Sequence, residues 1–100
     1  MGSAPHRTLA LPHSVDPHSA TVITGRVVDR DGHAVGGAFV RLLDSSNQFT
    51  AEVAASATGD FRFFVAPGSW TVRALAATGD GRAVVKPSGA GVHEVDVKIA

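Results

Sequence analysis

Five histidines are the side chains of this sequence best suited to metal binding or acid–base chemistry, and their spacing decides whether they can act together. His6, His13 and His18 are spread over a stretch that also holds three prolines, while His33 and His93 lie far along the chain. Zinc needs several imidazoles that the fold holds in place, and no H-E-x-x-H motif occurs. We therefore expect solvated histidines and no metal site.

Two further arrangements could in principle do chemistry. Asp29-Arg30-Asp31-Gly32 begins like a calcium loop, but the residues that follow supply neither further oxygen ligands nor a terminal glutamate, so a β-turn is expected. Ser45, His93 and Asp44 form a hydrolase triad on paper, but no nucleophile-elbow motif surrounds the serine. We expect no catalytic residue and no cofactor, and hence no enzyme.

Composition excludes other classes of function. The chain has 100 residues, of which 44% are hydrophobic and 18% charged, as in one globular domain. Nine Lys and Arg balance nine Asp and Glu, whereas binding to nucleic acid or an anionic membrane requires a basic surplus. There is no cysteine, so the chain cannot form disulfides or carry a persulfide on a thiolate.

The residue composition and the hydrophobic pattern of the sequence change near residue 20. Residues 1–20 hold Pro5, Pro12 and Pro17 without a sustained apolar period, which predicts an extended or disordered tail. No apolar run is long enough to span a bilayer, and no uninterrupted apolar segment forms a secretory signal, so a cytoplasmic location is expected. Residues 21–100 are expected to form the folded domain.

From residue 21 onward, short β-branched and aromatic runs alternate with Gly, Asp and Pro turns. The pattern predicts strands at 21–28, 38–43, 49–57, 61–65, 70–76, 82–86 and 95–99. The alanines of 49–57 leave a short helix as an alternative there. Seven short strands with turn residues between them are typical of an all-β fold, a seven-stranded Greek-key β-sandwich of transthyretin-like or Ig-like type.

Two blocks of this sequence resemble a known domain. Ile23-Thr24-Gly25-Arg26-Val27-Val28-Asp29, Gly32 and Val35-Gly36-Gly37-Ala38-Phe39-Val40-Arg41-Leu42 resemble the opening of carboxypeptidase regulatory-like domains, which are transthyretin-like sandwiches. Thr58-Gly59-Asp60-Phe61-Arg62-Phe63 and Pro67-Gly68-Ser69-Trp70-Thr71-Val72-Arg73-Ala74 resemble their closing half. The resemblance covers roughly residues 22–76.

The whole chain is similar to a family of small actinobacterial proteins encoded beside rhodanese-type thiosulfate sulfurtransferases. This resemblance implies a non-catalytic accessory or scaffolding domain with a sulfurtransferase as its protein partner. Members often have a cysteine near the N-terminus, where this chain has Gly2 and Ser3. Hydroxyisourate hydrolases share the transthyretin-like fold, but they end in Tyr-Arg-Gly-Ser, whereas this chain has no tyrosine.

Apolar residues on the outer faces of strands are the remaining candidates for a function. By strand alternation, Phe39, Leu43 and Phe64 lie opposite the expected core residues and are candidates for a partner-binding patch. The alternative is that a tail, a loop or the second sheet covers them. Trp70 is expected in the core with Val72. The alternative function is a carbohydrate- or cell-surface-binding module. Exposed edge strands leave a monomer or a weak homodimer open.

Overall fold

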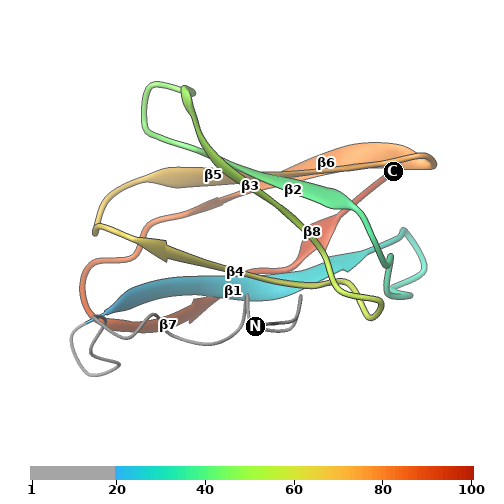
Figure 1. Cartoon of the computed structure of the whole chain (residues 1–100), viewed down its shortest axis with the longest axis horizontal. Coiled ribbons are helices and arrows are strands. Elements are labelled where there is room, and N and C mark those ends of the chain that lie inside the picture. The colour runs from blue at the N-terminus through green and yellow to red at the C-terminus, as the bar shows by residue number, and fades with distance from the viewer. Residues whose placement is uncertain (1–19) are drawn as a thin grey trace, which may run out of the picture.

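A computed structural model describes residues 20–100, and these residues form a sandwich of two β-sheets (Figure 1). The all-β sandwich expected from the sequence is thereby confirmed. The strands in chain order are β1 (Thr21–Val28), β2 (Phe39–Leu43), β3 (Phe49–Ala54), β4 (Asp60–Val65), β5 (Trp70–Ala76), β6 (Gly79–Val85), β7 (Gly91–Glu94) and β8 (Val97–Lys98).

The first sheet is built around β1. β4 pairs with β1 in antiparallel orientation, and β7 and β8 pair with it in parallel. β7 lies beside Thr21–Thr24 and β8 beside Val27–Val28, so the end of the chain follows β1 in two steps. This sheet is the lower layer in Figure 1.

The second sheet has the order β3-β2-β5-β6, and all its neighbours are antiparallel. It forms the upper layer in Figure 1. The pairing aligns Val40 with Ala74, and Leu42 with Val72. These four side chains are buried, so the alternate residues of the same strands point outward.

The core fills the space between the two sheets. Its large, fully buried side chains include Phe61, Ile23, Leu42 and Val27. Each such side chain contributes roughly 1.5–3 kcal/mol by leaving water. Trp70, which was expected in the core, is half-buried and packs against it, and its indole N–H donates to the carbonyl of Ala66 at 2.8 Å.

The described residues form eight strands, not the seven expected, because the C-terminal segment folds differently from its pattern. The predicted strand 95–99 is reduced to β8, and residues 91–94 form β7 before it. The predicted strand 82–86 begins earlier, at Gly79. At 49–57 the strand prediction is confirmed over Phe49–Ala54, and the alternative of a helix is wrong because these residues pair with β2.

Gly25 explains why the C-terminal segment is divided. A Cβ at this position would lie 1.6 Å from the carbonyl oxygen of Val95. The amide of Val95 donates to the carbonyl of Thr24 at 2.9 Å, so the backbone turns in against β1 where the side chain is missing. A glycine inside a strand is typical of a close backbone approach or a bulge, and at Gly25 the structure has the close approach.

The expected tail, residues 1–20, and its three histidines lie outside the described residues, except for Ala20. The boundary of the folded domain therefore stays a prediction. Within residues 20–100, no helix is long and apolar enough to cross a membrane.

Candidate functional site

The turn after β1 holds the one group of potential metal ligands found in residues 20–100, namely Asp29, Asp31 and His33. One carboxylate oxygen of Asp29 already accepts the backbone N–H groups of Asp31 and His33, both at 2.9 Å. The bond from the His33 amide is the main reason why the pKa of Asp29 is lowered. The imidazole of His33 is 80% exposed. The carboxylate of Asp29 thus closes the turn, as the sequence predicted for this segment.

Ser45, His93 and Asp44, which the sequence analysis considered as a hydrolase triad, do not come together as one. The carboxylate of Asp44 accepts the amides of Ser46 and Gln48, at 2.8 and 2.9 Å, and so shapes the β2–β3 loop. The imidazole Nε2 of His93 lies 3.1 Å from the carbonyl oxygen of Gly89. The serine's loop joins strands of the second sheet, whereas His93 lies in the first.

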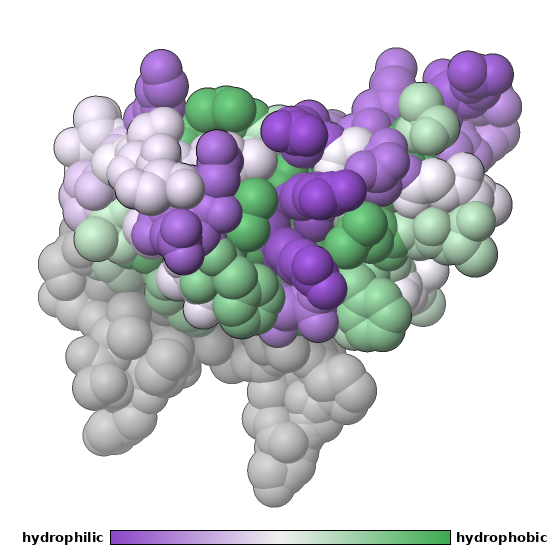
Figure 2. All heavy atoms as spheres, turned by 90° about the horizontal axis from the view of Figure 1, so that it is seen from above, coloured by the Kyte–Doolittle hydropathy of each residue, from purple (hydrophilic) through white to green (hydrophobic). Residues whose placement is uncertain are grey.

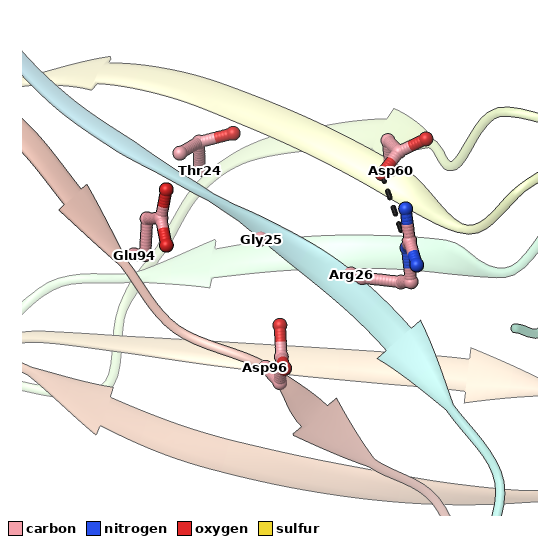
Figure 3. A pocket seen from close by; sticks show the side chains of 6 residues that line it. All are labelled: Thr24, Gly25, Arg26, Asp60, Glu94 and Asp96. Atoms are coloured by element: carbon pink, nitrogen blue, oxygen red, sulfur yellow. Dashed lines mark hydrogen bonds and ion pairs between the residues drawn. The ribbon is translucent and has the colours of Figure 1, made fainter. Parts of the chain in front are cut away.

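A shallow hollow of about 240 Å³ lies on the outer side of the first sheet, at Gly25. Figure 3 shows Gly25 at its centre, with carboxylates coming from β4, from β7 and from the link to β8. The hollow lies where the link between β7 and β8 passes Gly25. Its lining residues are Thr24, Gly25, Arg26, Asp60, Glu94 and Asp96.

The polar groups on the β4 side of this hollow bind one another. Arg26 Nε donates to Asp60 at 3.3 Å, and Thr24 Oγ1 donates to the carbonyl of Phe61 at 3.0 Å. Asp60 also accepts the hydroxyls of Thr58 and Ser56. These bonds, the one from Thr58 above all, lower the pKa of Asp60. An ionised carboxylate already held by three donors stabilises the turn before β4 and has little capacity left for a substrate.

The outer face of the second sheet is different, because apolar and charged side chains stand there in ordered rows. We call this surface the β2–β5 face; it consists of the outward residues of β3, β2, β5 and β6. The strand register places Arg41 opposite Glu52 on one side and Arg73 on the other, and Arg73 opposite Arg82. Figure 2 shows hydrophilic residues crossing this face between hydrophobic ones.

Apolar side chains flank the charged row on both sides. On one side Phe39 lies beside Leu75, and on the other Leu43 lies beside Phe49. Phe39 is 56% exposed, Phe49 62% and Val84 58%. Large exposed apolar groups beside charges are typical of protein-interaction surfaces.

Two of the three arginines of this row have acidic partners. Arg41 Nε lies 2.6 Å from Glu52, and an Nη of Arg73 lies 3.0 Å from Asp80. Arg82 has neither an ion pair nor a hydrogen bond with any residue of 20–100. The Nε of Arg73 is shielded from water and lacks a hydrogen-bond acceptor.

The structure brings together only part of the predicted patch. Phe39 and Leu43 lie on the β2–β5 face, but Phe64 belongs to β4 and lies outward on the other sheet, because β4 pairs with β1. The three residues therefore cannot form one surface. Sequence reasoning also missed the arginine row, although each arginine alternates with buried or half-buried residues in its own strand. The missing information was which strands pair.

Comparison with known proteins identifies relatives over the whole chain. A family model described as "Protein of unknown function (DUF1416)" matches residues 2–99. The uncharacterized proteins Rv0814c and Rv3118 of Mycobacterium tuberculosis are each 76% identical over 99 residues, which is 99% of this chain and 99% of theirs. An uncharacterized protein of Mycolicibacterium smegmatis is 70% identical over 90 residues, covering 90% of this chain and 100% of that protein.

Solved structures share the fold at low sequence identity. The Bacillus anthracis TIE protein matches 82% of this chain with a TM-score of 0.64 and 15% identity, over 18% of its own length. A DUF3823 family protein from Parabacteroides merdae gives a TM-score of 0.62 at 14% identity, and the match covers 82% of this chain and 46% of that protein. Chlorocatechol 1,2-dioxygenase from Pseudomonas putida gives a TM-score of 0.60 at 10% identity, and the match covers 87% of this chain and 62% of the dioxygenase.

This chain spans less than two thirds of each of these three structures, and at such identity the likeness shows the β-sandwich fold alone. The relatives of high identity are mycobacterial, which agrees with the actinobacterial family expected from the sequence. The match over residues 2–99 shows that the chain belongs to the DUF1416 family.

Proposed function

We propose that this protein is a non-catalytic accessory module that binds a protein partner through its β2–β5 face. The observation that carries the proposal is the exposure of Phe39, Phe49 and Val84 around a row of arginines on one sheet. Aromatic residues and arginine are the types enriched where proteins bind one another. Asp29 and Asp44 close turns, and Asp60 is paired with Arg26, so we take this face as the best candidate surface.

The partner we propose is a rhodanese-type thiosulfate sulfurtransferase. This choice rests on the resemblance of the sequence to a family encoded beside such enzymes. The chain has no cysteine, so the thiolate that carries sulfur must belong to the enzyme. The module would then position or stabilise the enzyme and take no part in the transfer itself.

We also infer that the sandwich is of the carboxypeptidase regulatory-like type. Its motif residues occupy positions that support this assignment. Gly25 admits the backbone at Val95, and Gly32 has a φ of 85° in the turn after β1. Gly59 has a φ of 80° in the turn before β4. Each of these positions needs glycine for a backbone reason.

A carbohydrate- or cell-surface-binding module is the second candidate. It is supported by fold likeness to BcpA, the major pilin subunit of Bacillus cereus, and by the exposed rings of Phe39 and Phe49. These rings flank the arginine row from opposite sides. Phe49 pairs with Leu43, and Leu43 lies four residues from Phe39 along β2, which is roughly 13 Å. Two such rings do not form one platform for a sugar ring, so we favour the protein partner.

The test is equilibrium binding of the purified full chain to a purified thiosulfate sulfurtransferase from the same organism. We expect saturable binding, and Val84→Ser should weaken it about tenfold, or about 1.4 kcal/mol. Val92→Ser is the matched control, since Val92 is 61% exposed but lies on the first sheet. If no binding is measured, or if both variants bind equally, the proposal is wrong; binding to glycans instead would favour the second candidate.

A further inference from the structure

We propose that the β2–β5 face recognises an extended acidic segment of its partner, with an apolar, an acidic and an apolar side chain at alternate positions. The inference rests on the proposed function, because it assumes that this face binds protein. It adds the chemistry of what is bound, which the arrangement of side chains on the face defines.

The first observation is the repulsion within the arginine row. Arg41 and Arg73 are direct cross-strand neighbours, and so are Arg73 and Arg82. Like charges directly opposite one another destabilise a sheet. Within this surface two acids, Glu52 and Asp80, accompany the three arginines, so one positive charge is left over. A carboxylate added from outside would complete the row.

The second observation is that hydrogen-bond donors on this row lack acceptors. The Nε of Arg73 is shielded from water without a partner, and the guanidinium of Arg82 has no acidic neighbour in residues 20–100. A guanidinium binds a carboxylate through two parallel N–H donors, which is stronger than a neutral hydrogen bond. Arg82 is therefore the residue we expect to receive the partner's carboxylate.

The third observation is the spacing of the rows. The rows that contain Phe39, Arg41 and Leu43 follow one another every two residues along β2, or about 6.8 Å apart. An extended partner strand presents alternate side chains at the same interval. A hollow of about 480 Å³ beside Phe39 and Leu75 can receive the apolar side chain at one end. Leu43 and Val84 offer an apolar surface at the other end.

A second copy of this chain is the competing occupant. The hollow at Gly25 carries Asp60, Glu94 and Asp96 on the outer side of the first sheet. Of these acids, Asp60 is already paired with Arg26, and the hollow is shallow. None of its acids stands in a strand between two apolar side chains at alternate positions, which is the pattern the face requires. We therefore propose a segment of another protein as the occupant.

The experiment compares the full chain with Arg82→Gln and with Arg30→Gln in binding to the sulfurtransferase. Both variants lose one positive charge, but Arg30 lies in the turn after β1 and is not one of the outward residues of β3, β2, β5 and β6. We expect Arg82→Gln to weaken binding at least about tenfold and to reduce its dependence on salt, with Arg30→Gln unchanged. Equal affinity for both variants would overturn the inference, while the loss caused by Val84→Ser would still support the proposed function.

A second measurement keeps the inference testable if the sulfurtransferase does not bind. The probe is a synthetic peptide of alternating Val and Thr with one central Glu, and the matched probe has Gln in its place. Tighter binding of the Glu peptide, lost in Arg82→Gln, supports the acidic segment even if the proposed enzyme is not the partner. Equal binding of both peptides overturns it. Sedimentation gives a third outcome. If the full chain self-associates and Arg82→Gln abolishes the association, the inference of an acidic partner segment is overturned in favour of a second copy of the chain.

Discussion

At the scale of single residues, Asp60 shows how an acidic side chain serves the fold. Its carboxylate accepts hydrogen bonds from Thr58, Ser56 and Arg26, which together join the turn before β4 to β1. The bond from Thr58 is the largest cause of the lowered pKa of Asp60. A carboxyl whose pKa is lower in the folded chain than in the unfolded chain stabilises the fold wherever it is ionised.

Asp60→Asn is expected to lower the unfolding free energy at pH 7 by about 1 kcal/mol, or the melting temperature by about 4–8 °C. The contribution of Asp60 is complete above its ordinary pKa of 3.8 and is lost as the pH falls through the lowered value. The difference in melting temperature between wild type and variant should therefore become smaller as the pH is lowered. Thermal unfolding followed by circular dichroism between pH 7 and pH 2 measures it.

Asp96→Asn is the control for this prediction. Asp96 lines the same hollow and is exposed, but it has no hydrogen bond or ion pair with any described residue. Its melting temperature should stay close to that of the wild type. A gap between Asp60→Asn and wild type that persists unchanged at pH 2 would contradict the electrostatic explanation.

At the scale of strands, β1 organises the first sheet because three strands pair with it. The change from β7 to β8 happens where Gly25 allows the backbone of Val95 to approach. The hollow with its three carboxylates lies at the same place on the outer side of the sheet. One glycine thus determines the path of the C-terminal segment.

Gly25→Ala is expected to destabilise the fold by about 3 kcal/mol, because its methyl group would overlap the Val95 carbonyl and force the strands apart. Gly89→Ala is the matched control, since a Cβ there would meet no atom within 4 Å. Chemical denaturation followed by fluorescence of the single tryptophan measures both variants. Equal stability of the two alanine variants would show that the crossing is not tightly packed.

At the scale of the molecule, the end of the chain joins the two sheets. Val97 and Ile99 are buried in the core, and β8 packs against β6 of the second sheet. The amide of Ile99 donates to the carbonyl of Val28, and that of Ala100 to Asp80, at 2.9 and 3.3 Å. The C-terminal segment therefore closes one side of the sandwich.

Removal of residues 97–100 should abolish cooperative unfolding. Losing a buried Val and a buried Ile costs several kcal/mol, which is comparable to the whole stability of a small domain, about 5–15 kcal/mol. Calorimetry of the shortened chain would show no sharp transition. Lys98→Ser, an exposed position between the two buried residues, should melt close to wild type. A shortened chain that melts cooperatively would contradict the importance given to this segment.

The sequence alone determined the class of fold, the inner faces of the strands and the structural use of several turns. Alternation placed Phe39 and Leu43 on the face of their strand that points away from the core, and the turn at Asp29 was also predicted correctly. These features depend on one residue and its near neighbours, since side chains alternate along a strand and turns depend on local backbone preferences.

Only the tertiary structure decided which strands are neighbours, and the surface follows from that choice. Pairing of β2 with β5, and of β5 with β6, gathers Arg41, Arg73 and Arg82 from distant parts of the chain into one row. Pairing of β4 with β1 removes Phe64 from the predicted patch. Alternation states which face of its own strand a residue occupies, but strand partners depend on the packing of the whole core, which no local pattern records.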